Sequence, residues 1–306
     1  MTPLPRIICL AGPTGVGKTA AALGLARAVA GEVVNADSRQ VYRDFPLITA
    51  QPTEEERAVC PHHLYGFLES RQGISAGRWA DMAFAAIEAL IRRGKTPIVV
   101  GGTGLYFRAL LEGIAEIPSV SPEITARWTA RCAEQGPESL HRELAEADPE
   151  SAARIHPRDR QRIVRAWEVL EATGRPLGWW HVHAAPAPRC VGLRLGLHTT
   201  LDALTPRLGR RIDAMLEAGA LEEARAARRH CPDGTAPGWS GIGCAELFRH
   251  LAGELPLEAA RQLWLRNTRA YAKRQLTWFR ADAGLRWFAP EAVGELCREA
   301  ELFLRG

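Results

Sequence analysis

Residues 12 to 19 read Gly12-Pro13-Thr14-Gly15-Val16-Gly17-Lys18-Thr19, a complete G-x-x-x-x-G-K-[ST] motif that we call the P-loop. An apolar run at 7–11 precedes it, and an alanine- and leucine-rich segment at 20–30 follows it before Gly31. This order predicts a strand, a glycine-rich loop and a helix. Backbone N–H groups of such a loop, together with the positive end of the helix, can surround a diphosphate. We therefore predict that residues 12–19 bind a diphosphate.

Two side chains of the P-loop carry chemistry of their own. Lys18 supplies positive charge to the phosphates, and the hydroxyl group of Thr19 can ligate Mg²⁺. Mg²⁺ is therefore the expected cofactor, with Thr19 as its protein ligand. We expect no further metal site, because His62-His63 and His181-x-His183 lie near no cysteine pair and form no H-E-x-x-H sequence.

Strand-like and helical segments alternate along the rest of the chain. Residues 32–36 and 96–100 predict strands, and 76–93 predict a helix that ends at Gly94. This alternation is typical of an α/β fold with a parallel sheet covered by helices on both faces. Later segments predict strands at 191–197 and 285–288, and helices at 201–217, 221–229 and 257–280.

The block from 117 to 188 breaks this alternation. It contains only helical patterns, interrupted by prolines and by Gly174-Arg175-Pro176. A strand pattern returns directly after it. We therefore predict an inserted all-helical domain at 117–188, within a P-loop core formed by 1–116 and 189–306.

The composition is that of a soluble globular protein, with 46% hydrophobic and 24% charged residues in 306. The N-terminal apolar run is too short for a secretion signal, and no stretch approaches the roughly 20 apolar residues that span a bilayer. The seven cysteines are odd in number and contain no C-x-x-C pair, which indicates reduced thiols. We expect a cytoplasmic protein with no membrane partner.

The positive charge is clustered, although the net charge is only +4. Residues 154–165 contain five arginines and one aspartate, and residues 261–280 contain six basic residues and no acidic one. Arginines beside Trp167 suit phosphate contact and base stacking. In the second segment, the seven-residue spacing of Trp264, Tyr271 and Trp278 is more typical of a core stripe. There we assign the charges, and not the rings, to a nucleic acid.

Several further residues follow predicted strands or share a helix face, and each has two interpretations. Asp37 lies at the carboxyl edge of the sheet, where it is either a base or substrate-orienting group, or the cap of the next turn. The glycines of Gly101-Gly102-Thr103-Gly104 indicate either a tight turn or a close approach to a ligand. Arg207 and Arg211, four apart on a helix, either clamp the diphosphate or face solvent.

Two functions fit these residues. One is a P-loop kinase that phosphorylates a small alcohol, and the other is a protein that uses the same loop for a different diphosphate. Small-molecule kinases usually form one compact domain of about 200 residues. The inserted arginine-rich block instead suits a large polyanion. We therefore keep the kinase as the second hypothesis.

The ordered motifs of the chain resemble those of the bacterial tRNA dimethylallyltransferases, also called tRNA isopentenyltransferases. The resemblance runs nearly end to end and rests on G-P-T-x-x-G-K-T at 12–19, D-S-R-Q-V-Y at 37–42, G-G-T-G-L-Y at 101–106, Q-R-x-x-R at 161–165 and A-K-R-Q-x-T-W-F-R at 272–280. It implies that dimethylallyl diphosphate, and not ATP, occupies the P-loop together with Mg²⁺. The implied acceptor is N6 of the adenosine immediately 3′ of the anticodon, in tRNAs that read codons beginning with U.

The same resemblance implies roles for individual residues. Asp37 acts on the N6 amine, while Lys18, Thr19, Arg211 and Thr103 stabilise the departing diphosphate. The helical domain grips the anticodon stem-loop, and we expect the enzyme to be a monomer. The implied tRNA-contacting residues are Asp37, Ser38, Arg39, Gln40, Thr103, Gln161, Arg162, Ile163, Val164 and Arg165.

The chain also departs from the family pattern at two places. Gln51 stands where the family usually has lysine, and Cys244-Ala245 replaces a tyrosine followed by a basic residue. The resemblance therefore does not extend to contacts at these two positions. A relative that prenylates free adenine nucleotides is an alternative, but such an acceptor gives no reason for the arginines of 154–165.

Overall fold

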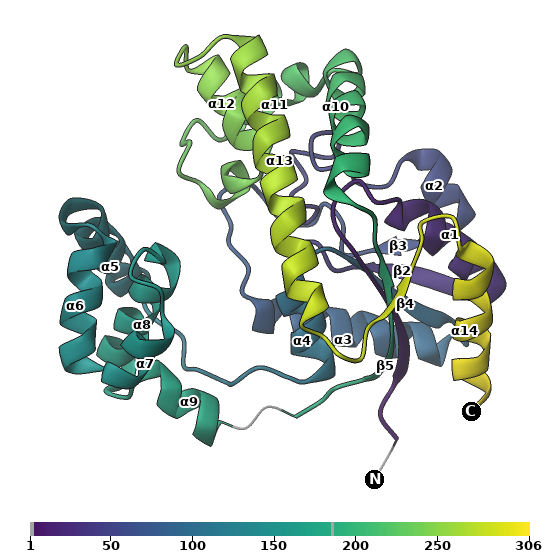
Figure 1. Ribbon diagram of the computed structural model, residues 1–306, viewed down its shortest axis with the longest axis horizontal. Coiled ribbons are helices and arrows are strands. Elements are labelled where there is room, and N and C mark those ends of the chain that lie inside the picture. Colours follow the sequence, from purple (N-terminus) through teal and green to yellow (C-terminus); the bar gives the residue numbers. More distant parts are fainter. Residues whose placement is uncertain (1–2, 185–186) are drawn as a thin grey trace. The chain divides into compact units, whose positions relative to one another are not determined.

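The computed structural model describes residues 3–184 and 187–306, which form two compact units (Figure 1). The core unit comprises Met1–Leu111 and Pro188–Gly306, and the helical unit comprises Glu112–Ala187. The sequence predicted an inserted helical domain at 117–188. The chain thus leaves the core unit after one of its helices and re-enters it just before a strand.

The core unit is built on one parallel sheet of six strands, in the order β3-β2-β4-β1-β5-β6. β1 lies inside the sheet, with Leu10 opposite Val100 of β4 on one side and opposite Leu195 of β5 on the other. The strands β1, β2 and β4 are almost wholly buried, as expected for a sheet covered on both faces. The α/β prediction is confirmed. The strands are β1 Arg6–Ala11, β2 Gly31–Asn35, β3 His62–His63, β4 Thr96–Gly101, β5 Val191–Leu197 and β6 Arg286–Phe288.

Helices cover both faces of this sheet (Figure 1). α1 and α14 pack on one face, where Leu25, Leu296 and Ala300 join Ile8 and Leu10 in a single apolar cluster. α3 and α4 lie on the other face. The helices and the one 3-10 turn of the core unit are α1 Lys18–Ala28, α2 Glu54–Val59, α3 Ala76–Arg92, α4 Gly104–Leu111, α10 Leu201–Glu217, α11 Ala220–His230, η1 Pro237–Ser240, α12 Cys244–Leu251, α13 Leu257–Arg280 and α14 Val293–Arg305.

Four of these helices, α2, α4, α12 and α14, were not predicted from the sequence, and neither was the 3-10 turn η1. α2 and α12 are short, with 6 and 8 residues. α14 lacks a side-chain N-cap and carries Gly294 in its first turn, so its start signal is weak. β3, with only 2 residues, was missed as well. The predicted bounds of the longer elements agree with the structure to within one or two residues.

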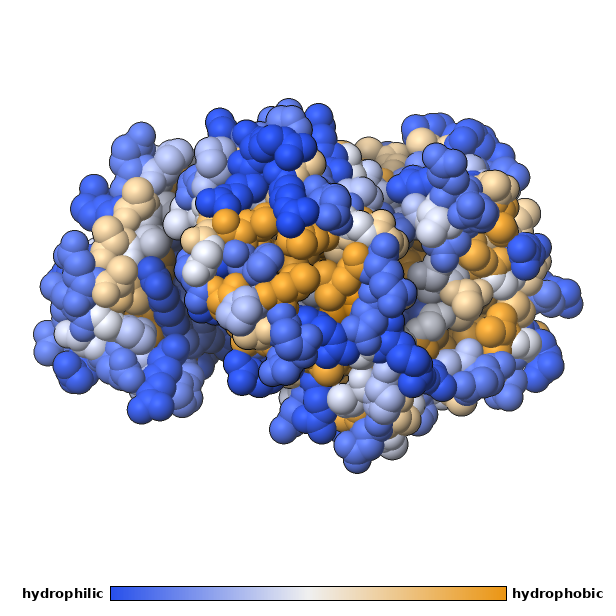
Figure 2. Space-filling model, turned by 90° about the horizontal axis from the view of Figure 1, so that it is seen from above, coloured by the Kyte–Doolittle hydropathy of each residue, from blue (hydrophilic) through white to orange (hydrophobic). Residues whose placement is uncertain are grey.

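A second apolar cluster of the core unit joins the segment after β2 to the helices α10 to α13. Phe45 contacts Trp239 edge to face, with ring centroids 4.8 Å apart, and both belong to this cluster. Partly buried members on α11 and α12 include Leu221, Phe248 and Leu251. Figure 2 shows an apolar area over this group of helices, bordered by hydrophilic side chains.

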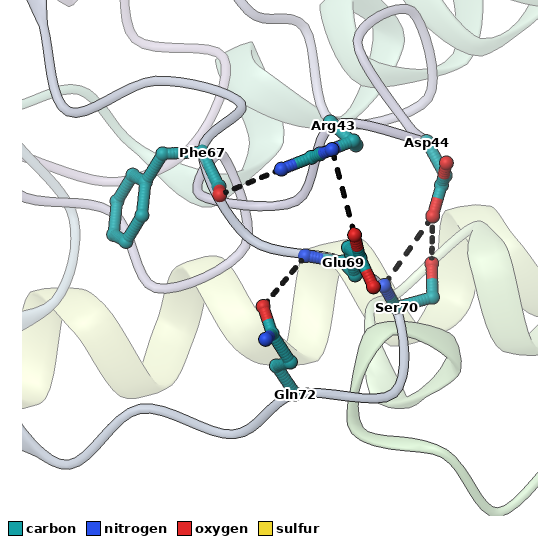
Figure 3. Close-up of polar contacts among 6 residues, drawn as sticks. All are labelled: Arg43, Asp44, Phe67, Glu69, Ser70 and Gln72. Carbon is teal, nitrogen blue, oxygen red and sulfur yellow. Dashed lines mark hydrogen bonds and ion pairs between the residues drawn. The ribbon is translucent and has the colours of Figure 1, made fainter.

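Polar contacts hold the segment after β2 against residues 67–72 (Figure 3). Arg43 donates a hydrogen bond to the carbonyl oxygen of Phe67 at 3.2 Å and lies 3.6 Å from the carboxylate of Glu69. The backbone N–H and hydroxyl groups of Ser70 donate to Asp44 at 3.3 and 2.5 Å. The segment that follows Asp37 is therefore anchored on the core unit.

The described residues of the helical unit form five helices: α5 Pro122–Gln135, α6 Pro137–Ala147, α7 Pro149–Arg154, α8 Arg160–Thr173 and α9 Leu177–His183. α5, α6 and α7 begin with a proline in the first turn, where the missing N–H group costs nothing. Trp128 of α5 stacks on Trp167 of α8, with ring centroids 4.6 Å apart. Trp167 also donates a hydrogen bond to the carbonyl oxygen of Leu140 at 3.2 Å. Trp167 is thus partly buried and packs against the core of the unit, and base stacking by its ring stays a prediction.

Two further observations concern the described residues, 3–184 and 187–306. None of their helices combines the length and the hydropathy needed to cross a bilayer. Their seven cysteines are all free thiols, of which six are buried. Burial raises the pKa of the Cys9 thiol, which is consistent with a packing role.

Candidate active site

The P-loop connects β1 to α1 and adopts backbone conformations that need glycine. Gly15 and Gly17 have φ angles of 79° and 104°. A Cβ atom at Gly12 would lie 2.8 Å from the carbonyl oxygen of Leu197, so this position also has no room for a side chain. The loop borders a cavity of about 430 Å³, the P-loop cavity, whose lining includes Lys18 and Thr19. Gly17, Lys18 and Thr19 at the start of α1 line this cavity, and the first turn of a helix has N–H groups without partners inside the helix.

Lys18 is held inside the loop. Its Nζ donates hydrogen bonds to the carbonyl oxygens of Gly12 and Pro13, both at 2.9 Å. Burial lowers the pKa of Lys18 to about 8, and Arg211 acts in the same direction, whereas Asp37 opposes the shift. An anion in the P-loop cavity would favour the charged form of Lys18.

Asp37 follows β2 and is oriented by a buried amide that the sequence analysis missed. The Asn35 side chain accepts a hydrogen bond from the Asp37 N–H group at 2.8 Å and donates to the Asp37 carbonyl oxygen at 3.1 Å. It also donates to the carbonyl oxygen of Leu64 at 2.9 Å. Trp79 of α3 donates to the Asn35 carbonyl oxygen at 3.1 Å. An asparagine at the end of a buried strand was the signal available in the sequence.

The position of the Asp37 carboxylate is compatible with both interpretations, and its role as a base stays a prediction. Its Oδ1 accepts a hydrogen bond from the Arg39 N–H group at 2.8 Å, which caps the turn as one interpretation predicted. The side chain also lines two cavities, the P-loop cavity and a second one of about 280 Å³. Capping the turn therefore leaves Asp37 at the place where a ligand would bind.

This second cavity, which we call the α13 cavity, has an apolar wall and several polar groups. The polar side chains include Tyr271 of α13, whose pKa is raised to about 12 by burial and by nearby Asp37. Tyr271 is therefore a protonated phenol at neutral pH and can donate a hydrogen bond. The apolar wall consists of Ile48, Leu208, Ile212, Met215, Ile242 and Trp264. The two cavities share the residues Thr14, Asp37, Thr49, Arg211 and Met215.

Of the two arginines predicted to clamp the diphosphate, Arg211 is the one that lines both cavities. Its pKa is lowered by burial, while Asp37 raises it. Arg207, one turn earlier on α10, lines the P-loop cavity, and its guanidinium lies 3.9 Å from the carboxylate of Glu291. Asp37 thus interacts electrostatically with two cations, Lys18 and Arg211.

The glycines at 101–104 make room for other parts of the protein. A Cβ atom at Gly101 would lie 2.1 Å from the carbonyl oxygen of Ala36. At Gly102 and Gly104 it would lie 2.0 Å from Gln275 Nε2 and 1.9 Å from Trp278 Nε1. The close approach suggested by the sequence is therefore an approach of β2 and α13 to this turn.

Thr103 joins the same turn to the Asp37 segment. Its hydroxyl oxygen accepts a hydrogen bond from the Ser38 N–H group at 3.0 Å and donates to the Ser38 hydroxyl at 3.3 Å. Its own N–H group donates to the Ala36 carbonyl oxygen at 3.1 Å. A contact of Thr103 with diphosphate or tRNA stays a prediction.

Ser38, Arg39 and Gln40 surround Asp37 and already have partners in the protein. Arg39 donates to the Ser240 hydroxyl at 2.6 Å and to the Pro237 carbonyl oxygen at 3.3 Å. Gln40 donates to the carbonyl oxygens of Thr49 and Ala50 at 3.0 and 2.6 Å. Ser38 and Arg39 line the α13 cavity, and Gln40 lines the P-loop cavity.

The predicted tRNA-contacting residues of the helical unit fall into two groups on α8. Gln161 and Arg162 are exposed, and Arg165 is partly exposed and paired with Glu168 at 3.2 Å. Ile163 and Val164 are 0% and 8% exposed and pack in the core of the unit. Only the first group presents side chains to a partner in solution.

The two departures from the family pattern have different surroundings. Gln51 lines the P-loop cavity, and its amide donates a hydrogen bond to the Tyr42 carbonyl oxygen at 2.7 Å. Cys244 is fully buried at the start of α12, within the second apolar cluster. Ala245 is partly buried beside it.

The donor set for a metal is sparse. Among the residues that the structure describes, no group of three or more His, Cys, Asp or Glu side chains could hold an ion. The Thr19 hydroxyl group, on an exposed residue in the first turn of α1, lines the P-loop cavity. This set fits Mg²⁺ that takes most of its ligands from phosphate oxygens and water.

Comparison with known proteins gives one consistent family. Residues 40–282 match a family model described as IPP transferase. The chain is 62% identical over 303 residues to a tRNA dimethylallyltransferase of Nitratidesulfovibrio vulgaris, which covers 99% of this chain and 98% of the relative. It is 60% identical over 294 residues to a tRNA dimethylallyltransferase of Desulfovibrio desulfuricans, covering 96% and 91%.

Solved structures agree with the sequence relatives. The full-length tRNA isopentenylpyrophosphate transferase from Bacillus halodurans has a TM-score of 0.73 and 32% identity, with 98% of this chain and 97% of that chain covered. A eukaryotic dimethylallyltransferase, described as acting on tRNA, has a TM-score of 0.78 and 29% identity, with 97% and 77% covered.

Proposed function

The chain belongs to the tRNA dimethylallyltransferase family, and we propose that it moves a dimethylallyl group from dimethylallyl diphosphate to tRNA. The acceptor is N6 of the adenosine immediately 3′ of the anticodon, in tRNAs that read codons beginning with U. The observation that carries this proposal is the position of Asp37, which lines both the P-loop cavity and the α13 cavity and interacts with Lys18 and Arg211.

The donor would bind with its diphosphate in the P-loop cavity. N–H groups of the loop and of the first turn of α1, with the charges of Lys18 and Arg211, are complementary to this anion. The dimethylallyl group would then extend toward the apolar wall of the α13 cavity. Met215 belongs to this wall and also lines the P-loop cavity. Burying this tail releases apolar surface from water.

Mg²⁺ is part of the proposal. The Thr19 hydroxyl group is the protein ligand, and the bound ion would neutralise charge on the diphosphate.

The acceptor adenine has to leave its stack in the anticodon loop to reach Asp37, as bases modified by other enzymes do. The carboxylate of Asp37 accepts a proton from the N6 amine while nitrogen forms a bond to the allylic carbon. The bond between that carbon and the diphosphate oxygen breaks, and its electron pair leaves with the diphosphate. Lys18 and Arg211 stabilise the charge that develops there.

Contact with the rest of the tRNA would come from exposed basic side chains. Arg162 on α8 has a side chain that is 63% exposed. On α13, Arg266, Arg269, Lys273, Arg274 and Arg280 are exposed. These charges favour binding to phosphates, which a small free nucleotide would not require. The relatives named above are all tRNA dimethylallyl- or isopentenyltransferases, which favours this function over a small-molecule kinase.

The test is a single-turnover assay with saturating unmodified tRNA and labelled dimethylallyl diphosphate. We expect the wild-type protein to incorporate label into tRNA and to release diphosphate. Asp37→Asn should bind both substrates but transfer about 10²–10⁴-fold more slowly, the usual effect of removing a general base. Asp81→Asn is the matched control, because Asp81 is exposed and pairs with Arg189 on the surface of the core unit. Phosphorylation of a small alcohol by ATP, without prenyl transfer, would disprove the proposal.

A further inference from the structure

A buried glutamine links the P-loop to the turn at 101–104. Gln275 of α13 is 4% exposed. Its Oε1 accepts a hydrogen bond from the Thr14 N–H group at 2.9 Å, and its Nε2 donates to the Gly102 carbonyl oxygen at 2.9 Å. The side chain thus accepts a hydrogen bond from the backbone of the P-loop and donates one to the backbone of the turn at 101–104.

The packing around this amide leaves little freedom. A Cβ atom at Gly102 would lie 2.0 Å from Gln275 Nε2, and one at Gly104 would lie 1.9 Å from Trp278 Nε1, one helical turn further along α13. Two glycines of the turn are therefore needed to let α13 approach. Because a buried amide without partners is unfavourable, Gln275 holds both loops at the spacing set by its own length.

This contact has a consequence for the P-loop. The Thr14 N–H group is directed to Gln275, so it is not directed to a phosphate. Thr14 also lines both the P-loop cavity and the α13 cavity. The position of Thr14 therefore affects the space between the bound diphosphate and Asp37.

We propose that Gln275 is a positioning residue that holds the P-loop at the distance from Asp37 at which the donor diphosphate binds productively. This rests on the proposed function of the same site. Gln275 acts through Thr14 and Gly102 and touches neither substrate. Gln275 is buried, whereas Lys273 and Arg274 beside it on α13 are exposed. Loss of the amide should therefore affect the donor and not tRNA affinity.

The first variant is Gln275→Leu, which removes both hydrogen bonds at nearly the same volume. We expect kcat/KM for the donor to fall about 10- to 100-fold, as for displacements of about 1 Å in other sites. The dissociation constant for tRNA should stay within about twofold of the wild-type value. Gln262→Leu is the matched control on the same helix, because Gln262 is exposed and bonds only to Glu258 at 2.9 Å.

The second variant, Gln275→Glu, gives a readout that a merely structural role would not produce. A protonated glutamic acid has the same acceptor and donor pattern as glutamine, whereas a carboxylate has no donor for the Gly102 carbonyl oxygen. We expect the donor affinity of Gln275→Glu, relative to wild type, to recover as the pH is lowered. Inorganic diphosphate, measured by calorimetry, is the second probe and needs no transfer activity.

Two results would overturn the inference. One is wild-type affinity of Gln275→Leu for dimethylallyl diphosphate and for inorganic diphosphate. The other is a pH-independent ratio between Gln275→Glu and wild type. Should Gln275→Leu fail to fold, Gln275→Glu decides alone. Failure of the proposed function is distinguishable, because the wild-type protein would then transfer no prenyl group while the diphosphate measurements still report on Gln275.

Discussion

The side chain of Asn35 brackets the backbone of Asp37, accepting a hydrogen bond from its N–H group at 2.8 Å and donating one to its carbonyl oxygen at 3.1 Å. Asn35 is fully buried, and Trp79 holds its carbonyl oxygen. Asn35 therefore fixes the backbone from which the Asp37 carboxylate projects, and the Arg39 N–H group holds its Oδ1 at 2.8 Å. A base that is already oriented does not have to be ordered during the reaction.

Replacing Asn35 with alanine should misalign Asp37 without removing it. We expect kcat to fall about 10²-fold while the donor KM changes little, because the P-loop is untouched. Single-turnover rates with saturating substrates measure this. Asn267→Ala is the control, since Asn267 is a partly buried amide on α13 that bonds to Glu246 at 2.7 Å. Equal losses in the two variants would contradict the assignment.

Donor binding should depend on the protonation of Lys18, whose pKa in the free protein is lowered to about 8. The bound diphosphate favours charged Lys18 and raises this pKa. Affinity should therefore be highest below about pH 8 and weaken up to tenfold per pH unit above it, until the pKa of the complex is reached. Calorimetry from about pH 7 to about pH 10 measures the change. Lys18→Arg should abolish this inflection, because arginine stays charged.

The two arginines of α10 should differ in their effect on the donor. Arg211 lines both cavities, so Arg211→Ala should weaken donor binding and slow transfer, by about 10- to 100-fold in kcat/KM for a lost charged hydrogen bond of about 1.5–3 kcal/mol. Arg207→Ala should have a smaller effect, because Arg207 is 47% exposed and faces Glu291. Steady-state kinetics with varied donor compare the two. A larger loss for Arg207→Ala would reverse their roles.

The affinity for tRNA should fall steeply with salt, because arginine–phosphate contacts release counterions. Arg162→Ala should reduce the slope of log K against log salt by about one. Arg261→Ala should change it less, since Arg261 makes two hydrogen bonds to Asp213 at 2.5 and 2.8 Å. Binding measured over a series of salt concentrations gives the slopes. A flat plot for the wild-type protein would exclude phosphate contacts as the main source of affinity.

Much of this protein could be read from local sequence patterns. The spacing of glycines in the P-loop and the apolar period of the strands and helices depend on residues close together in the chain, and they predicted the parallel α/β core. The place of Asp37 after β2 followed in the same way. Short or weakly capped elements such as β3, α12 and α14 were not predicted, because their sequence signals are no stronger than those of ordinary loops.

The arrangement around the reacting groups came from contacts between distant segments. Gln275 and Thr14 are 261 residues apart, and Gln275 and Gly102 are 173 apart. Neither hydrophobic periodicity nor motif spacing in the sequence indicates that two residues so far apart form a hydrogen bond. The roles of Asn35, Gln275 and the glycines at 101–104 therefore became visible only in the folded chain, because a buried hydrogen-bonding group is satisfied by whichever segment the packing brings beside it.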